Sequence, residues 1–292
     1  MALTLSIVTP SYNQGMFLEQ TIGSVLNQAY PHLEYVVIDG GSRDESVAIL
    51  NRYSDRLTYW VSEPDGGMYD ALNKGFSHTT GDIMAWINSD DMYTAWAFAV
   101  VGQIFEQLPQ VEWLTTSLPL SWGENSTPTG VSVSRGYSQR GFYAGEHLPY
   151  ARWYADKFIQ QESTFWRRSL WEKAGGALDT VYPLAGDFAL WARFYQHAPL
   201  HTIQLPLGGF RKHSYGQKTS ALQDYIADCE RALHDMGGKP AGRVKSACRK
   251  LSARFIPHAL KPITAKIGMS YPAHGCVWDE SARQWAVKSR FV

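Results

Sequence analysis

The first 115 or so residues alternate short apolar runs with amphipathic helical patterns, and no other feature constrains the fold as strongly. Each run is rich in Val, Ile and Leu and has the length of a buried strand, whereas the segments between runs repeat apolar side chains at helical spacing. Repeated strand–helix units predict an α/β fold with a mostly parallel sheet flanked by helices. The runs expected as strands are residues 3–8, 33–39, 57–62 and 83–87.

The second half of the chain is less regular. Residues 121–145 are rich in Gly, Ser, Thr and Pro, which predicts a long irregular ribbon. Helical spacing returns after this ribbon and is interrupted once by a short apolar run. The expected helices are residues 169–174, 187–197, 220–234 and 243–255, and the expected strand is 200–205.

The composition excludes several classes of protein. Twenty-seven basic residues balance 27 acidic ones, so the net charge of zero gives no electrostatic reason to bind nucleic acid. The three cysteines form no C-x-x-C pair, which argues against a zinc knuckle or a disulfide framework. No window approaches the roughly 18 apolar residues of a spanning helix, and the first residues lack the basic start of a signal peptide. We therefore expect a cytoplasmic protein.

Two adjacent carboxylates, Asp90 and Asp91, follow the fourth expected strand. In such sheets ligands bind beyond the carboxyl ends of the strands. Neighbouring carboxylates repel each other, and a hard cation such as Mg²⁺ or Mn²⁺, which prefers oxygen ligands, would neutralise them. The alternative is that both side chains only shape a turn or cap the next helix.

A glycine-rich turn leads into a polar helix face after the third expected strand. Gly66 and Gly67 let the backbone approach a ligand closely. Asp70, Asn73 and Lys74 follow at helical spacing and share one face. Such a face is often only solvated, and the sequence leaves that alternative open.

Six polar or glycine-containing segments follow one another along the chain: TPSYN at 9–13, VIDGGS at 37–42, DGGMYDALNKG at 65–75, NSDD at 88–91, QESTFWRR at 161–168 and AGDFALWAR at 185–193. In this order and spacing they resemble the glycosyltransferases of family two, which have the GT-A fold. The resemblance covers roughly residues 3–215. It implies a GT-A domain over 1–216, with a nucleotide-sugar half (1–117) and an acceptor half (118–216), followed by a helical, basic extension (217–292).

The resemblance implies a nucleotide-sugar site at the ends of the first four strands. Asp91 would hold the divalent metal, Mn²⁺ or Mg²⁺. His213 is the candidate for a second metal ligand, because several GT-A enzymes use a late histidine; the alternative is an ordinary surface histidine. The residues that would bind the nucleotide sugar are Pro10, Tyr12, Asn13, Asp39, Asp65, Gly67, Asp70, Asn73, Lys74, Ser89 and Asp90.

Asp187 matches the position of the family's catalytic base. An inverting transferase must deprotonate the attacking acceptor hydroxyl, and a carboxylate at a helix start suits this role. Many relatives have Glu-Asp at this point, whereas this chain has Gly186 before Asp187. A simple helix cap is the alternative. The acceptor groove would be lined by Glu162, Trp166 and Trp191, although such tryptophans more often lie in the core.

A basic stretch follows the family segments. No acidic residue occurs between Asp235 and Asp279, where eight Lys and Arg residues lie. Apolar side chains recur at helical spacing within this stretch. We expect a basic amphipathic helix within residues 239–266 that lies on an anionic membrane. The alternative is a helix docked on the catalytic domain with a solvated basic face.

Together these features predict an inverting, metal-dependent glycosyltransferase. It would move one hexosyl or N-acetylhexosaminyl group from a nucleotide sugar, preferably a UDP-sugar, to a glycan or polyprenyl-linked acceptor in cell-surface polysaccharide synthesis. It would work in the cytoplasm, peripheral to the inner face of the membrane. A nucleotidyltransferase is an alternative, but it would need a basic glycine-rich loop where this chain has TPSYNQG at 9–15. A catalytically silent nucleotide-sugar-binding protein would not need Asp91 and Asp187 together.

Overall fold

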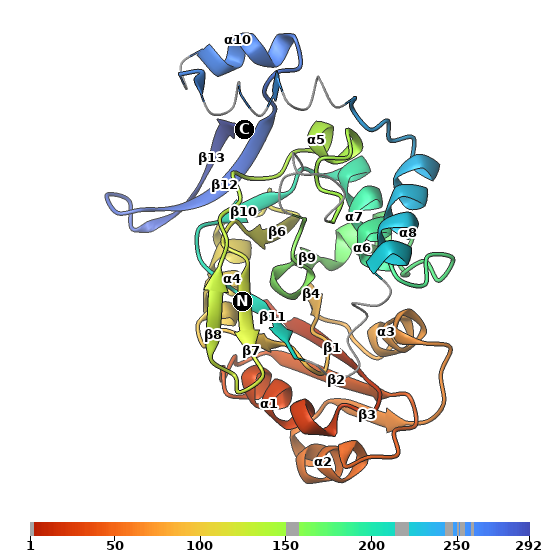
Figure 1. Ribbon diagram of the computed structural model, residues 1–292. Coiled ribbons are helices and arrows are strands. Elements are labelled where there is room, and N and C mark those ends of the chain that lie inside the picture. The colour runs from red at the N-terminus through yellow and green to blue at the C-terminus, as the bar shows by residue number, and fades with distance from the viewer. Residues whose placement is uncertain are drawn as a thin grey trace.

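The computed structural model describes residues 3–149, 158–213, 222–242, 248–249, 251, 255–257 and 260–292. Within these residues nine strands form one sheet, in the order β13-β12-β10-β6-β9-β4-β1-β2-β3. The expected α/β class is confirmed, since helices flank a mixed, mostly parallel sheet (Figure 1).

The first half of the chain builds one end of this sheet from strand–helix units. β1, β2, β3 and β4 are mutually parallel where they pair; β1, β4 and most of β2 are buried, whereas the edge strand β3 is only partly buried. The elements are β1 (Leu5–Ser11), α1 (Gly15–Leu26), β2 (Leu33–Asp39), α2 (Ser46–Tyr53), the 3₁₀ turn η1 (Ser54–Arg56), β3 (Tyr59–Ser62), α3 (Met68–Ser77) and β4 (Ile83–Trp86).

The strand order reverses at β1, and this reversal positions the site. The chain steps from β1 outward to β2 and β3 and then returns to β4 on the other side of β1. Because strand–helix–strand crossovers are right-handed, α1 and α2 cover one face and α3 the other (Figure 1). The ends of β1 and β4 lie side by side at this reversal, and the Thr21 hydroxyl of α1 donates to the carbonyls of Ser89 and Asp91 after β4, at 2.8 Å each.

The second half inserts one antiparallel strand and adds a smaller sheet. β9 (Phe165–Arg167) runs antiparallel between β4 and β6 (Trp113–Thr116). A four-stranded sheet has the order β5-β11-β7-β8. The region expected as an irregular ribbon thus contains two paired strands, and that expectation is wrong in part. These elements are β5 (Met92–Tyr93), α4 (Ala97–Gln107), β7 (Leu120–Gly123), β8 (Pro128–Val131), α5 (Gln139–Tyr143) and β11 (Gly208–Lys212).

The helices of residues 168–235 gather beside β9, and the chain's last strands extend the sheet at its far edge (Figure 1). The expected helices near 169–174, 187–197 and 220–234 are present, whereas most of the helix expected at 243–255 lies outside the described residues. The elements are η2 (Gln161–Ser163), α6 (Arg168–Lys173), α7 (Gly186–His197), β10 (His201–Ile203), α8 (Leu222–Asp235), α10 (Lys261–Lys266), β12 (Pro272–Asp279) and β13 (Gln284–Phe291).

The C-terminal extension is not purely helical, which corrects the expectation for residues 217–292. β12 pairs in parallel with β10, and β13 pairs antiparallel with β12. The backbone N–H of Trp285 also donates to the Gln107 side chain on α4 at 2.7 Å. The hairpin therefore belongs to the main sheet. In the described part of the chain, no helix has both the length and the apolar character needed to cross a bilayer.

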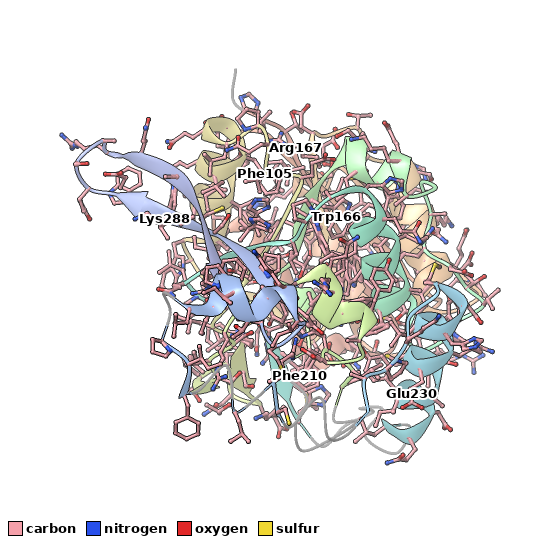
Figure 2. All side chains as sticks on the ribbon, turned by 90° about the horizontal axis from the view of Figure 1, so that it is seen from above. Phe105, Trp166, Arg167, Phe210, Glu230 and Lys288 are labelled. Atoms are coloured by element: carbon pink, nitrogen blue, oxygen red, sulfur yellow. The ribbon has the colours of Figure 1, made fainter. Side chains whose placement is uncertain are left out.

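An aromatic cluster fills the core between the sheet and α7. The rings of Trp86 and Trp191 stack with centroids 5.9 Å apart, and Trp113 and Trp191 stack at 5.7 Å. Trp166 packs edge-on against Trp86 at 5.5 Å. Figure 2 shows Trp166 deep among the side chains, whereas Lys288 projects from the hairpin into solvent.

Candidate active site

The turn after β2 is held by the Asp39 carboxylate, which is fully buried. Its Oδ1 accepts from the Ser42 hydroxyl at 2.6 Å, and its Oδ2 accepts from the Ser42 N–H at 2.8 Å and the Ser62 hydroxyl at 2.6 Å. Asp39 therefore ties the ends of β2 and β3 together. A nucleotide hydroxyl or amide that binds Asp39, as expected, would therefore donate to a carboxylate that already accepts three hydrogen bonds.

The turn after β1 presents an aromatic ring at the same edge. Pro10 lies buried inside β1, next to Ile38 of β2. Tyr12 is 62% exposed. Asn13 adopts a positive φ of 51°, and its side-chain oxygen accepts from the Arg43 N–H at 2.9 Å. Pro10 and Asn13 thus shape the turn, and Tyr12 offers a flat exposed surface.

The segment after β3 is exposed and glycine-rich, as expected. Gly67 has a φ of 109°, a conformation that favours glycine, and its N–H donates to the Asp65 carboxylate at 2.8 Å. The Gly66 N–H donates to Asp70 at 2.9 Å. Lys74 forms an ion pair with the Glu63 carboxylate. The acidic and basic side chains of this segment therefore stabilise the turn itself in this structure.

Asn73 has a structural role that its place in the motif did not indicate. Its amide nitrogen donates to the Leu178 carbonyl at 3.0 Å, and its side-chain oxygen accepts from the Leu178 N–H at 2.7 Å. This pair of bonds ties α3 to the loop between α6 and α7. Asn73 therefore connects the nucleotide half to the acceptor half.

Asp90 and Asp91 point to different partners. Asp91 is fully buried, and its Oδ1 accepts from the Arg211 N–H at 2.7 Å while its Oδ2 accepts from the Asn88 amide at 3.2 Å. Asp90 Oδ2 lies 3.0 Å from His213 Nε2. Ser89 is buried, and its carbonyl accepts from the Thr21 hydroxyl at 2.8 Å. The structure brings His213 to this pair, and its imidazole is buried rather than on the surface.

Glu162 lies in η2 and is 6% exposed, so it is not a residue of an open groove rim. Gly208 of β11 passes against it so closely that a Cβ at position 208 would lie 2.0 Å from the Glu162 carbonyl oxygen. Burial, together with the charges of Asp187 and Asp90, raises the pKa of Glu162 to about 7. Glu162 therefore lies within electrostatic reach of both the strand-end pair and the expected base.

The expected base, Asp187, is half-buried in the first turn of α7. Its Oδ2 accepts from the Tyr225 hydroxyl of α8 at 3.3 Å. Tyr69 of α3 lies beside it and donates to the Leu184 carbonyl at 2.9 Å. A carboxylate at a helix N-terminus is stabilised by the helix dipole, which favours the ionised form that a base requires.

Burial and like charge dominate the electrostatics between these groups. Burial raises the pKa of Asp91 well above its usual range, and the charges of Asp90 and Glu162 add to this effect. Hydrogen bonds from Arg211 and Asn88 act in the opposite direction. Three carboxyl groups thus share a largely buried region, and negative charge there needs compensation.

Trp166 and Trp191 do not line an acceptor groove, which corrects that expectation. They are 0% and 1% exposed, respectively. Both rings are buried and pack against other aromatic side chains, so a sugar has no access to them.

The comparisons with known proteins agree with this architecture. Residues 6–109 match the family described as Glycosyl transferase family 2. An uncharacterised glycosyltransferase of Mycobacterium tuberculosis H37Rv, Rv1514c, is 35% identical over 193 residues, which are 64% of this chain and 66% of the relative.

Residues 6–109 of the chain belong to glycosyltransferase family 2. The matched region spans slightly less than two thirds of the relative's length. Among solved structures, Staphylococcus aureus TarS 1-349 in complex with UDP-GlcNAc has a TM-score of 0.60, with 15% identity over 89% of this chain and 78% of TarS. Mannosyltransferase PcManGT from Pyrobaculum calidifontis, in complex with GDP-Man and Mn²⁺, has a TM-score of 0.51, with 16% identity over 91% and 79%. These likenesses show the GT-A fold.

The carboxyl groups around Asp90 and Asp91 were expected to hold a divalent metal. Among the described residues, no group of three or more His, Cys, Asp and Glu side chains is arranged to hold an ion. However, Glu162 Oε2 is buried without a hydrogen-bond partner, and it belongs to the cluster that contains Asp90 and Asp91. Hard oxygen ligands with uncompensated negative charge fit Mg²⁺ or Mn²⁺.

Sequence reasoning missed two polar residues of this family 2 site. Arg211 is fully buried, and its Nε donates to the Asp90 carbonyl at 2.5 Å. Its alternation with the exposed Phe210 and Lys212 in β11 is a strand signal that would have placed it inside. Tyr225 had no such signal, because it reaches the site only through the packing of α8 on α7.

Proposed function

We propose that this chain transfers one hexosyl or N-acetylhexosaminyl group from a nucleotide sugar, with a UDP-sugar favoured, to a glycan or polyprenyl-linked acceptor with inversion. The observation that carries the proposal is the placement of Asp187 at the start of α7, within electrostatic reach of the Asp90, Asp91 and Glu162 cluster. Two carboxylate centres then serve two roles, one at the nucleotide diphosphate and one at the acceptor hydroxyl.

Asp187 would accept the proton of the acceptor hydroxyl as that oxygen attacks the anomeric carbon. The bond from the anomeric carbon to the diphosphate oxygen breaks as the new glycosidic bond forms, and the nucleoside diphosphate leaves. An ionised carboxylate is required at the start, and the position of Asp187 in the first turn of α7 favours it. General base catalysis of this kind contributes about 10²–10⁴-fold to a rate.

Asp91 would hold a divalent cation, with Asp90 and His213 beside it. When bound, the cation would stabilise the negative charge that develops on the departing diphosphate. The exposed ring of Tyr12 would stack on the nucleobase, and the exposed turn around Gly67 would border the diphosphate. Lys74 could assist there only after it leaves its ion pair with Glu63.

The two alternative functions, a nucleotidyltransferase and a catalytically silent binding protein, would give different reaction products. A nucleotidyltransferase would release pyrophosphate from a nucleoside triphosphate. A silent binding protein would bind nucleotide sugar without turnover in the presence of any acceptor. The position of Asp187 beside Tyr69 of the 65–75 segment and close to Glu162 supports a transferase, because neither alternative needs a second carboxylate there as a base.

We also propose that the protein works at the inner face of the membrane, on cell-surface polysaccharide, and docks through residues around α10. Leu260, Ile263 and Ile267 are 49%, 62% and 72% exposed, and Lys266 is exposed beside them. This surface is apolar, carries a basic residue and belongs to the stretch without acids, which suits an anionic bilayer. Figure 1 shows α10 at the margin of the molecule.

Vesicle sedimentation tests this docking surface. The full chain should bind vesicles that contain phosphatidylglycerol more strongly than neutral vesicles, and binding should weaken as salt is raised. The double variant I263S/I267S should bind at least ~10-fold less, since two aliphatic side chains are lost from the buried face. Val181→Ser is the matched control, because Val181 is 63% exposed but lies in the loop before α7. Equal binding by the double variant and the control would contradict the proposal.

A thermal-shift screen tests the donor assignment. UDP-, GDP- and dTDP-sugars are added with and without Mn²⁺, and a bound ligand raises Tm by mass action. We expect the largest rise with a UDP-sugar plus Mn²⁺. A rise with nucleoside triphosphates only would favour a nucleotidyltransferase, and no rise with any nucleotide sugar would contradict the proposed function.

A further inference from the structure

Helix α8 lies outside the six family segments, yet it contacts the chain that leads into Asp187. The Asp228 carboxylate accepts from the Leu184 N–H at 3.1 Å, and the Asp235 carboxylate accepts from the Tyr182 hydroxyl at 2.8 Å. Arg231 donates to the Val181 carbonyl at 2.5 Å. Three side chains on one helix therefore hold the loop immediately before α7.

A fourth side chain of α8 reaches the carboxylate itself. Tyr225 donates from its hydroxyl to Asp187 Oδ2 at 3.3 Å. Burial raises the pKa of Tyr225, and the negative charge of Asp187 raises it further, so Tyr225 stays protonated and remains a donor at neutral pH. A donor aimed at a carboxylate fixes its orientation and favours its ionised form.

We propose that Tyr225 is a positioning residue that orients the Asp187 carboxylate and keeps it ionised, so that α8 is part of the catalytic domain. This inference rests on the proposed role of Asp187 as the base. Among the described residues, other titratable groups near Asp187 are Tyr69 on α3, Glu162 on η2 and Cys229 on α8. Tyr69 shares a hydrogen bond with the Asp187 backbone, and Glu162 and Cys229 feel its charge, whereas the Tyr225 hydroxyl donates to the Asp187 carboxylate itself.

The test compares Tyr225→Phe with the wild-type chain across pH. The variant keeps the ring and its packing and removes only the hydroxyl. We expect kcat/KM to fall about tenfold, which is the scale for a lost hydrogen bond to a charged group. We also expect the acidic limb of its pH profile to move to higher pH by about one unit, because the ionised carboxylate loses a donor. The KM for the donor should not change.

Tyr182→Phe is the matched control, because it removes a hydroxyl that binds the same helix but does not reach Asp187. It should leave the pH profile in place even if Tm falls. An acidic limb that moves equally in both variants, or in neither, overturns the inference.

Asp187→Asn separates this inference from the proposed function. If Asp187→Asn retains turnover, then Asp187 is not the base and the proposed function fails. If Asp187→Asn is inactive and Tyr225→Phe shows the wild-type pH profile, only the role of Tyr225 fails.

Discussion

The ring of Tyr69 fills the space that a side chain at position 186 would occupy. A Cβ built on Gly186 would lie 2.8 Å from two ring atoms of Tyr69 and 2.9 Å from a third. This contact explains why the chain has glycine before Asp187, where the family resemblance leads one to expect glutamate. The first turn of α7 can pack against α3 only if residue 186 has no side chain.

Gly186→Ala should therefore destabilise the protein. Alanine in a helix is favoured over glycine by up to about 1 kcal/mol, but overpacking against a buried ring costs about 1–3 kcal/mol, so the steric effect should prevail. Tm measured by calorimetry should fall by a few degrees. In a Tyr69→Ala background, Gly186→Ala should no longer lower Tm. A higher Tm for Gly186→Ala in the wild-type background would show that the contact relaxes without cost.

Trp191 should contribute to stability rather than to acceptor binding. Trp191→Ala should lower the free energy of unfolding by about 3–5 kcal/mol, as expected when a buried aromatic ring is removed. The milder Trp191→Phe should be folded and should keep the acceptor KM of the wild type. Trp278→Phe is the control, because Trp278 is 40% exposed on β12 and should change stability little. A raised acceptor KM in Trp191→Phe, at unchanged stability, would restore the groove interpretation.

His201 should make stability depend on pH at the seam between β10 and β12. Burial, together with the neighbouring His274, whose ring centroid lies 5.5 Å away, lowers the pKa of His201 to about 4. The unfolded histidine has a pKa of about 6.5, so the unfolded state binds more protons between these values. Stability should therefore be full above pH 6.5 and should be lost as pH falls towards 4, by roughly 3 kcal/mol in total.

Urea unfolding at several pH values measures this dependence. Because carboxylates also titrate near pH 4, the informative quantity is the difference between the wild type and His201→Gln. The variant should be less stable at pH 7.5 but should have a shallower pH dependence between 4.5 and 6.5. Parallel curves for the two proteins would assign the pH dependence to other groups.

Asp91→Asn should remove the effect of Mn²⁺ on nucleotide binding. The substitution is isosteric and keeps an oxygen that can accept from the Arg211 N–H, but it removes the charge that a cation requires. Calorimetric titration with UDP should then give the same affinity with and without Mn²⁺. Asp55→Asn, at an exposed acid in η1, should bind like the wild type. Wild-type metal dependence in Asp91→Asn would refute its role as a metal ligand.

The nucleotide half of the fold was predictable because its signals are local. Short β-branched runs and helical spacing identify β1 to β4, and the strand ends place Asp39 and Asp90 at one edge of a parallel sheet. A sequence motif does not show, however, which residues its side chains contact in the fold. Asn73 shares the motif with Lys74, yet its amide binds the backbone of Leu178, more than a hundred residues away in sequence.

The acceptor half was harder to predict because its elements are short and depend on tertiary contacts. β9 has three residues, which is too few to show strand alternation, and its antiparallel insertion depends on β4 and β6. The β12–β13 hairpin joins the main sheet because β12 pairs with β10, and this long-range pairing leaves no local signal in the sequence. Tryptophan content alone does not distinguish the core from the surface. For this reason the sequence suggested Trp166 for an acceptor groove, whereas the structure buries it in the core.

The most direct test of the account measures turnover and donor binding of Asp187→Asn side by side. We expect the variant to bind the UDP-sugar with wild-type affinity, because the proposed role of Asp187 is to deprotonate the acceptor rather than to bind the donor. We expect its turnover to fall at least ~100-fold, the usual scale for the loss of a general base. Turnover close to that of the wild type, with donor binding intact, would contradict the central claim that Asp187 is the catalytic base.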